Sequence, residues 1–246
     1  MSNPSQRPRL AYISILAERG AYDLARYVDP AEGADDRDWF AARLAELGLA
    51  DAFDVVAVDA ANGGPLPATD SVDIAVIGGS LHSVSEERPW QRRIWDWLPA
   101  YRRRGTPLLG ICGGHQMIAR LGGVPVTVLD DGPWAGSLPV QLSPAGATHA
   151  LFRDHPAEPR FHFGNNEHVS RLPAGAEVLA AVDGSPCLAL DHGGNWLSVQ
   201  FHPEATGRAM AQAWLHTAPE NAMKYVDTPD GPTLLRNFLS LVAGRA

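Results

Sequence analysis

Residues 107–114 read Pro107-Leu108-Leu109-Gly110-Ile111-Cys112-Gly113-Gly114, a short apolar run that ends in a cysteine among glycines. A helix-like stretch over residues 114–121 follows directly, and Gly122 and Gly123 end it. A buried strand, a tight glycine turn and a helix in immediate succession form the repeating unit of α/β proteins with parallel sheets. The sequence therefore predicts that Cys112 lies at the carboxyl end of a buried strand.

The same alternation of strands and helices extends in both directions from this turn. Helical spacing of apolar residues predicts helices, one of them followed by Gly48 as a C-terminal cap. Short β-branched runs predict buried strands, and one of them ends in the turn Gly78-Gly79-Ser80. The expected strands are residues 10–16, 53–58, 73–77, 107–111 and 196–201, and the expected helices are 36–47, 90–103, 114–121 and 232–242. This order predicts an α/β fold with a mostly parallel sheet.

Three stretches depart from the simple alternation. Residues 124–190 contain short strands between proline and glycine turns, which indicates an antiparallel flap packed on the main sheet. Residues 18–36 and 205–230 are long, mostly polar segments, each either a functional loop or a surface addition. We expect a single domain over residues 9–246, preceded by a disordered leader over residues 1–8.

The charge, the apolar runs and the cysteine count of the sequence disfavour several classes of partner. A net charge of −8 disfavours a nucleic-acid partner, and no apolar run approaches the roughly 18 residues that cross a bilayer, so no membrane partner is expected. Two cysteines and no secretory signal fit the cytoplasm. We expect no cofactor and no metal site, because the remaining histidines lack ligand spacing: His149, His155, His162, His168 and His192.

Two short motifs could carry chemistry. Gly110-Ile111-Cys112-Gly113-Gly114 has the form of a nucleophile elbow, in which a helix amino terminus favours a thiolate. His202 follows a predicted buried strand, and Glu204 lies two residues further on, beyond Pro203. A cysteine nucleophile needs a base, and the base needs an orienting group, so the three could form a Cys-His-Glu set. Taken singly, each motif is equally explained by an ordinary strand exit.

Together the motifs resemble a known family. Gly110-Ile111-Cys112-Gly113-Gly114-His115-Gln116, followed by Val199-Gln200-Phe201-His202-Pro203-Glu204, is similar to the paired signature of class I (triad-type) glutamine amidotransferases. The resemblance extends over most of the chain, from Leu10 to the last helix. It implies a flavodoxin-like three-layer sandwich, with a mostly parallel central sheet and a small antiparallel flap.

The resemblance also implies roles for single residues. Cys112 would attack the side-chain amide of glutamine, His202 would act as base and then acid, and Glu204 would orient His202. The oxyanion hole would use N–H groups at Gly79 and Gly113, and substrate binding is expected at Gln116, Asn166 and Glu167.

Two positions depart from the family pattern. Gly113 stands where a larger residue is usual, which predicts a roomier elbow, and Asn165 stands where many members have histidine.

Three functions remain open on this basis. The first is a glutaminase that passes ammonia to a separate synthetase, because no synthetase-like region follows the motifs in this sequence. The second is a stand-alone hydrolase or transpeptidase of γ-glutamyl peptides or amides. The third is a catalytically silent module, which the complete Cys-His-Glu set disfavours. We expect Cys187 to be an inert buried thiol, and Trp39, Trp95 and Trp196 to pack in the core.

Overall fold

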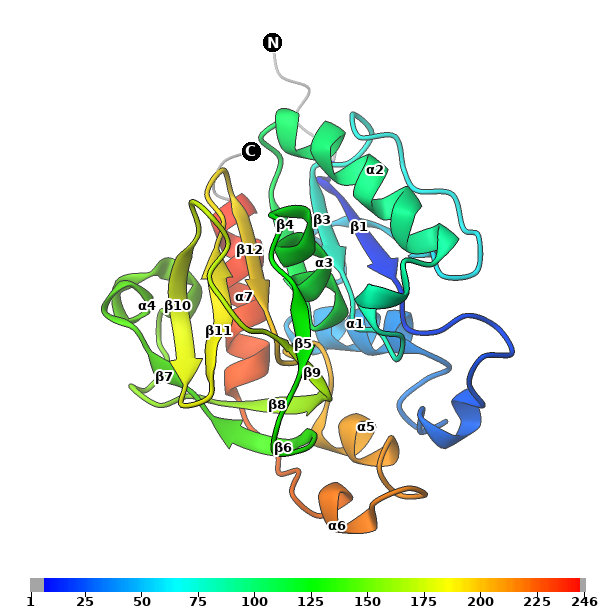
Figure 1. Cartoon of the computed structure of the whole chain (residues 1–246). Helices are drawn as coiled ribbons and strands as arrows, with labels where there is room; N and C mark the ends of the chain where they lie inside the picture. The colour runs from blue at the N-terminus through cyan, green and yellow to red at the C-terminus, as the bar shows by residue number, and fades with distance from the viewer. Residues whose placement is uncertain (1–6, 244–246) are drawn as a thin grey trace.

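The protein is described by a computed structural model over residues 7–243. An eight-stranded sheet runs through its centre in the order β2-β1-β3-β4-β12-β11-β10-β7 (Figure 1). The five strands from β2 to β12 are parallel, and the last three pair antiparallel. The central strands are β2 (Asp54–Asp59), β1 (Arg9–Ser14), β3 (Ile74–Ile77), β4 (Leu108–Ile111) and β12 (Trp196–Val199), and the antiparallel edge is β11 (Ser185–Asp191), β10 (Glu177–Val182) and β7 (Gln141–Leu142). The predicted mostly parallel sheet is confirmed.

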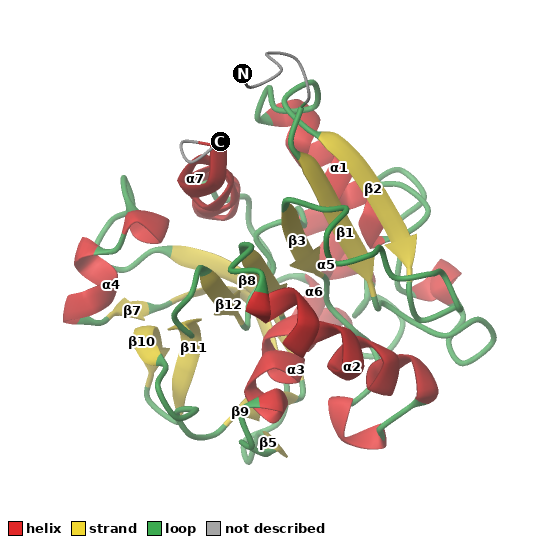
Figure 2. Ribbon diagram, turned by 90° about the horizontal axis from the view of Figure 1, so that it is seen from above, coloured by secondary structure: helices red, strands yellow, loops and turns green. Residues whose placement is uncertain are grey.

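Helices cover both faces of this sheet, which makes the three layers of the predicted sandwich (Figure 2). One face carries α1 (Asp36–Glu46) and α7 (Asp230–Ala243), and the other carries α2 (Pro89–Arg103) and α3 (Gly113–Leu121). The predicted helices are found within about two residues at their ends, as is usual for boundaries read from pattern. Gly48 follows α1 with a φ of 69°, the left-handed conformation of a glycine that ends a helix.

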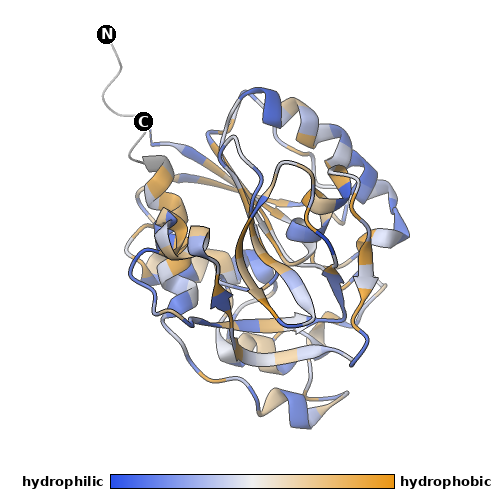
Figure 3. Cartoon of the chain, turned by 60° about the vertical axis from the view of Figure 1, so that its left-hand side comes forward, coloured by the Kyte–Doolittle hydropathy of each residue, from blue (hydrophilic) through white to orange (hydrophobic). Residues whose placement is uncertain are grey.

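Alternating side chains along the parallel strands supply both cores. In β1, Leu10 and Tyr12 join the core under α1 and α7, whereas Ala11 and Ile13 join the core under α2 and α3. All four are fully buried, because a strand covered on both faces has no solvent side. Figure 3 shows apolar colour along the central strands and a mixture of polar and apolar colour on the helices that cover them.

The region from 124 to 190 divides in a way that the sequence does not indicate. Two separate two-stranded antiparallel sheets form here, whereas β7, β10 and β11 extend the main sheet instead of packing on it. The pairs are β5 (Val126–Val128) with β9 (Glu167–Val169), and β6 (Trp134–Pro139) with β8 (Arg160–Asn165). The helix α4 (Pro144–Thr148) and the 3-10 turn η3 (Ala150–Phe152) join β7 to β8. The antiparallel flap is therefore the two small sheets alone.

The two long segments meet at the carboxyl ends of the parallel strands (Figure 1). Residues 18–36 contain only the 3-10 turn η1 (Leu24–Arg26), and residues 205–230 contain α5 (Gly207–Gln212) and α6 (Pro219–Ala222). Ion pairing joins them, with Arg208 Nε 2.6 Å from Asp29 Oδ2, and the Thr206 hydroxyl donates to Glu32 at 2.9 Å. Together the two segments thus cover the carboxyl ends of the parallel strands.

The predicted leader and the possibility of a membrane-spanning helix concern the ends and the whole of the described chain, respectively. The leader predicted over residues 1–8 lies mostly outside the described residues, which begin at residue 7. Between residues 7 and 243, no helix combines the length and the apolar character that crossing a membrane requires.

Candidate active site

Cys112 occupies a strained turn between β4 and α3. Its φ of 48° and ψ of −100° lie outside the regions that a non-glycine residue ordinarily adopts, a conformation that costs about 1–3 kcal/mol. The helix begins at the next residue, so its positive end lies beside the sulfur. The side chain is 5% exposed. The predicted elbow is present, and its strain is of the kind that folds retain at functional sites.

His202 reaches this elbow because β12 is the parallel neighbour of β4. Ile111 and Val199 are register partners, and the Cys112 N–H donates to the Val199 carbonyl at 2.8 Å. The carboxyl ends of the two strands therefore coincide, and the residues that follow them emerge side by side. A separation of 90 positions in sequence (202 minus 112) is thereby closed, and the Cys112 and His202 side chains line the same cavity.

Glu204 completes the constellation on the other side of the imidazole ring. Its Oε1 lies 2.8 Å from His202 Nδ1, and both side chains are buried. Burial lowers the pKa of His202, but the Glu204 carboxylate and the Cys112 side chain raise it by more, so the pKa lies well above its ordinary value. The geometry therefore favours an imidazolium paired with the Glu204 carboxylate.

The turn Gly78-Gly79-Ser80, which follows β3, packs closely against His202 and the elbow. A Cβ on Gly79 would lie 2.6 Å from His202 Cε1, so only glycine lets the ring approach the turn. A Cβ on Gly113 would lie 2.8 Å from Ser80 Cβ and 3.0 Å from Ser80 N. The expectation of a roomier elbow at Gly113 is wrong, because Ser80 occupies the space that a larger residue would need. The two glycine turns nevertheless touch, because the Gly114 N–H donates to the Gly78 carbonyl at 3.0 Å.

Gln200 is a site residue that the sequence reading did not identify. Its side-chain amide donates to Cys112 Sγ at 3.5 Å, and Gln116 donates to its Oε1 at 3.2 Å. Gln116 also donates to the Glu167 carbonyl at 2.9 Å. A signal was available, since Gln200 is a polar residue between Val199 and Phe201 in an otherwise apolar strand exit.

Cys112 opens onto two cavities that differ in chemistry. The first, called the polar cavity here, has a volume of about 320 Å³. Its lining includes all three residues predicted to bind substrate, together with one hydroxyl and one further acid: Gln116, Asn166, Glu167, Ser83 and Glu86. The Ser83 hydroxyl donates to Glu167 Oε1 at 2.9 Å, which fixes that carboxylate at the cavity wall. Asn165 also lines this cavity, and its side-chain amide donates to the Glu167 carbonyl at 3.0 Å.

The second, called the apolar cavity here, has a volume of about 220 Å³ and lies on the His202 side of Cys112. Its apolar walls come mostly from the two long segments and from α1, with Leu16 from the end of the β1 region, and include Leu16, Tyr27, Trp39, Met210, Ala213 and Trp214. Trp39 does pack in a buried cluster, as predicted, but it also faces this cavity. The sequence could not assign these residues to one site, because they lie almost 200 positions apart.

Asp36 is a second buried acid near the site. It is 1% exposed and accepts hydrogen bonds from the Ser14 hydroxyl at 2.6 Å and the Tyr12 hydroxyl at 3.0 Å. Burial raises the pKa of Asp36 to about 7, against the lowering effect of the two hydroxyls, and the nearby Asp35 and Glu204 carboxylates add to the rise. Its sequence position at the start of a helix looks like an ordinary cap, and only the tertiary structure reveals its burial.

Asp36 predicts a measurable pH dependence of stability. In the unfolded chain this carboxyl ionises near 3.8, whereas in the folded protein it keeps its proton until about pH 7. Its contribution is thus fully present below pH 3.8 and is lost as the pH rises through 7. Relative to Asp36→Asn, the wild type is expected to lose about 3 kcal/mol of unfolding free energy between pH 5 and pH 8. Urea unfolding at both pH values measures this, and a constant difference between the two proteins would contradict it.

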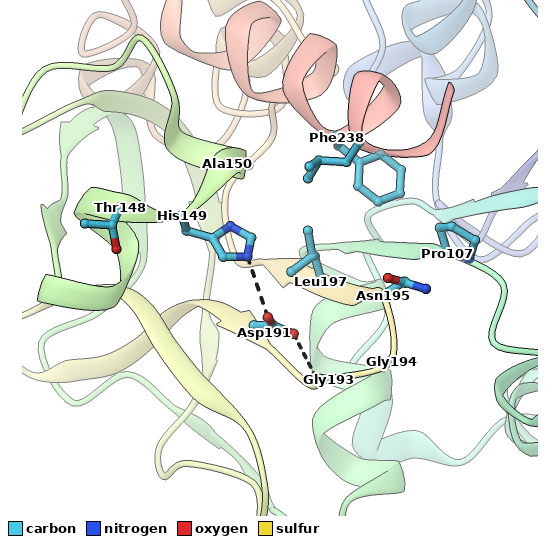
Figure 4. Close-up of a pocket in the computed structure, with 11 residues that line it drawn as sticks. Pro107, Thr148, His149, Ala150, Asp191, Gly193, Gly194, Asn195, Leu197 and Phe238 are labelled. Atoms are coloured by element: carbon cyan, nitrogen blue, oxygen red, sulfur yellow. Dashed lines mark hydrogen bonds and ion pairs between the residues drawn. The ribbon is translucent and has the colours of Figure 1, made fainter. Parts of the chain in front are cut away.

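A cavity of about 430 Å³, larger than the polar or the apolar cavity, lies at the opposite end of the sheet, where the parallel strands begin (Figure 4). It is lined by residues that precede β4 and β12, including Pro107 and Asn195, and by the pair His149 and Asp191, whose side-chain atoms lie 3.6 Å apart. The amino ends of parallel strands are not where ligands bind in open α/β sheets. We therefore place the active site at Cys112, where the strained elbow and the charged pair coincide.

The second cysteine differs sharply from the first. Cys187 is 1% exposed on β11, and burial raises its pKa to about 11, so about one thiol in 10⁴ is ionised at pH 7. We expect iodoacetamide to modify Cys112 in the native protein while Cys187 stays unmodified, as measured by peptide mass spectrometry over time. In Cys112→Ser the native protein should take up no label. Equal labelling rates at the two cysteines would contradict an activated Cys112.

Two of the other histidines, His162 and His192, make hydrogen bonds inside the fold. His162 and His192 are buried and hydrogen-bonded to serines, and burial lowers the pKa of both to about 4. Over residues 7–243, no three His, Cys, Asp or Glu side chains gather in a way that could hold a metal ion.

Comparisons with known proteins agree with the arrangement around Cys112. Residues 51–219 match the family described as "Glutamine amidotransferase class-I". A GMP synthase [glutamine-hydrolyzing] of Aeropyrum pernix is 31% identical over 180 residues, which are 71% of this chain and 33% of that protein. The corresponding enzyme of Xylella fastidiosa is 38% identical over 113 residues, or 44% of this chain and 21% of that protein. The chain thus spans about a fifth to a third of these relatives.

Solved structures show the same fold at low identity. A glutamine amidotransferase from Thermotoga maritima superposes with a TM-score of 0.72 at 18% identity, covering 97% of this chain and 99% of that one. One from Methylobacillus flagellatus gives a TM-score of 0.69 at 16% identity, covering 97% and 96%. The family match covers more than half of the chain and contains the elbow, the histidine and the glutamate. The chain belongs to the class-I glutamine amidotransferase family.

Proposed function

We propose that this protein hydrolyses a γ-glutamyl amide through a thioester on Cys112, with glutamine as the simplest substrate. One observation carries the proposal. A cysteine on a strained elbow shares a cavity with a buried histidine, whose Nδ1 lies 2.8 Å from a buried glutamate. This is the geometry of an activated nucleophile with its base and an orienting acid.

In the first half of the reaction, Cys112 Sγ attacks the amide carbon. The oxyanion that forms would be held by the N–H groups at Gly79 and Gly113, and collapse of the intermediate breaks the C–N bond. His202 gives its proton to the departing nitrogen, and Glu204 stabilises the charged ring until the proton leaves. The products of this half are an amine, or ammonia from glutamine, and the γ-glutamyl thioester.

In the second half, water hydrolyses the thioester. His202 takes a proton from the water as its oxygen bonds to the acyl carbon, and the C–S bond then breaks to release a free γ-carboxylate. The polar cavity would hold the amino acid head group, with the fixed Glu167 carboxylate facing the α-ammonium group and Gln116 and Asn166 beside it. A carboxylate at the cavity wall is the charge that an ammonium group requires.

The destination of the ammonia follows from the relatives rather than from the site. Proteins named GMP synthase [glutamine-hydrolyzing] contain a region similar to this chain. We propose a separate synthetase as the partner that accepts ammonia. A second candidate function, cleavage of γ-glutamyl amides of larger amines without such a partner, is favoured by the apolar cavity beside His202.

The test is ammonia release from glutamine by the purified chain, alone and with a co-purified partner. Hydroxylamine in the assay would convert the thioester into a γ-glutamyl hydroxamate, which reports acylation of Cys112 separately from hydrolysis. The matched control is Cys187→Ala, which removes the other thiol and should keep the activity. If glutamine and other γ-glutamyl amides yield neither amine nor hydroxamate under any of these conditions, the proposed function fails.

A further inference from the structure

The apolar cavity lies beside His202, the residue proposed to protonate the leaving nitrogen. His202 lines the apolar cavity and is not among the residues that line the polar cavity, whereas Cys112 lines both. In amide cleavage the nitrogen must leave toward the group that protonates it, which the preceding section assigns to His202. Whatever substituent the nitrogen carries is then directed into the apolar cavity, while the γ-glutamyl part occupies the polar one.

The lining of the apolar cavity matches a particular kind of substituent. Its walls include a leucine, a methionine, an alanine and three aromatic side chains: Leu16, Met210, Ala213, Tyr27, Trp39 and Trp214. None of the described residues that line it is Asp, Glu, Lys or Arg. A volume of about 220 Å³ is many times what ammonia occupies, given that a water of similar size takes about 30 Å³ in the liquid.

These walls are held in place by contacts that do not involve Cys112. Met210 and Trp39 belong to one buried cluster with Leu16, Val28 and Ala209. The Trp214 indole donates to the Tyr225 hydroxyl at 2.8 Å, and that hydroxyl donates in turn to the Phe163 carbonyl at 2.5 Å. Outside the cavity, ion pairing of Arg208 with Asp29 joins the two long segments. The cavity is therefore a built feature of the fold and not a gap left between loops.

We propose that the apolar cavity is the subsite for the amine part of the substrate, and that it takes an uncharged aromatic or branched aliphatic amine. This inference rests on the proposed Cys112 thioester chemistry and names the substrate class within it. An amine that carries a carboxylate, as the amino acid of a γ-glutamyl dipeptide does, would place that charge among walls whose one cationic group in the described lining, His202, is already paired with Glu204. The preferred substrates are then γ-glutamyl amides of simple apolar amines.

The amine part of the substrate should affect one kinetic constant, kcat/KM. All γ-glutamyl amides yield the same thioester once the amine has left, so contacts to the amine act only on acylation and appear in kcat/KM. By microscopic reversibility, an amine that fits as leaving group also fits as acceptor. With glutamine as donor, phenethylamine should therefore attack the thioester carbon, lose a proton to His202 and leave as γ-glutamylphenethylamide while the C–S bond breaks.

The experiment compares glutamine, γ-glutamylmethylamide, γ-glutamylphenethylamide and γ-glutamylphenylalanine, the last two differing only by a carboxylate. We expect kcat/KM to be at least about tenfold higher for the phenethylamide than for the methylamide, since each buried methylene contributes about fourfold. The phenylalanine compound should fall at least about tenfold below the phenethylamide.

Two variants locate the effect. Ala213→Phe fills the apolar cavity and should lower kcat/KM for the phenethylamide at least about tenfold more than for glutamine. Ala211→Phe is the matched control, because Ala211 lies in α5 but does not line the cavity. In Cys112→Ala, calorimetric binding of the phenethylamide should show a negative heat-capacity change that Ala213→Phe abolishes.

The outcomes separate this inference from the function on which it rests. If glutamine is turned over but apolar substituents lower kcat/KM, or if Ala213→Phe leaves the substrate ratios unchanged, the amine subsite is refuted and the thioester chemistry stands. If the amides release no amine and yield no γ-glutamyl hydroxamate with hydroxylamine present, the proposed function itself is refuted.

Discussion

Replacing Cys112 with alanine is expected to lower γ-glutamyl amide cleavage by about 10⁴-fold or more, equivalent to about 5 kcal/mol of transition-state stabilisation. The reason is that Sγ forms the bond on which both halves of the proposed reaction depend, and no second thiol can replace it. Cys187 lies on β11 with a pKa raised to about 11 by burial, and it is fully enclosed. Steady-state amine release and hydroxamate formation both measure the loss.

The control for this variant uses the strain at the elbow. Cys112→Ala keeps the φ of 48°, whereas Cys112→Gly removes the cost of that conformation. The glycine variant should therefore be inactive but more stable than the alanine variant by about 1 kcal/mol in urea unfolding. Residual activity in both variants near that of the wild type would show that Cys112 is not the nucleophile.

The second large effect is expected at Glu204. Glu204→Gln keeps the shape of the side chain but removes the carboxylate that lies 2.8 Å from His202 Nδ1. Loss of the orienting charge should reduce kcat/KM by on the order of 10⁴-fold, as in other triads where the acid becomes an amide. A loss below about tenfold would mean that Glu204 is structural and that His202 is held by other groups.

The pH profile distinguishes a charge effect from a packing effect. Burial lowers the pKa of His202, and Glu204 and Cys112 raise it by more, so removing the Glu204 charge must lower that pKa. The imidazolium needed to protonate the leaving nitrogen is then lost at a lower pH. The alkaline limb of kcat/KM should move to lower pH in Glu204→Gln, whereas a variant that only loosens packing would reduce the rate without moving the limb.

Much of the fold could be predicted because its signals are local. The parallel strands appear in the sequence as short apolar runs, and burial on both faces of β1 explains why that run is continuous. The antiparallel region was harder, since the short strands between 124 and 190 carry no local mark of which sheet they join. Pairing of β10 with β11 and β7 extends the main sheet, a choice made by long-range contacts.

The three residues of the Cys-His-Glu set were predicted for a related reason. Cys112 and His202 each follow a strand directly, and the carboxyl ends of parallel strands meet at one edge of a sheet. Gln200 was missed although its polar side chain stands out in an apolar run, because pattern alone does not reveal that it points at the sulfur. Asp36 was missed because a carboxylate at a helix start is ordinary, and its burial depends on Tyr12 and Ser14 of another element.

By itself, the sequence determined that Cys112 lies on an elbow after one strand and that His202 and Glu204 follow the end of another, since strand ends follow from local hydrophobic patterning. It did not determine the space around the sulfur. Ser80 closes the elbow beside Gly113, and segments almost 200 residues apart enclose the apolar cavity on the His202 side. Such a cavity is defined by side chains from remote segments packing together, so only the tertiary structure decided its size and its apolar lining.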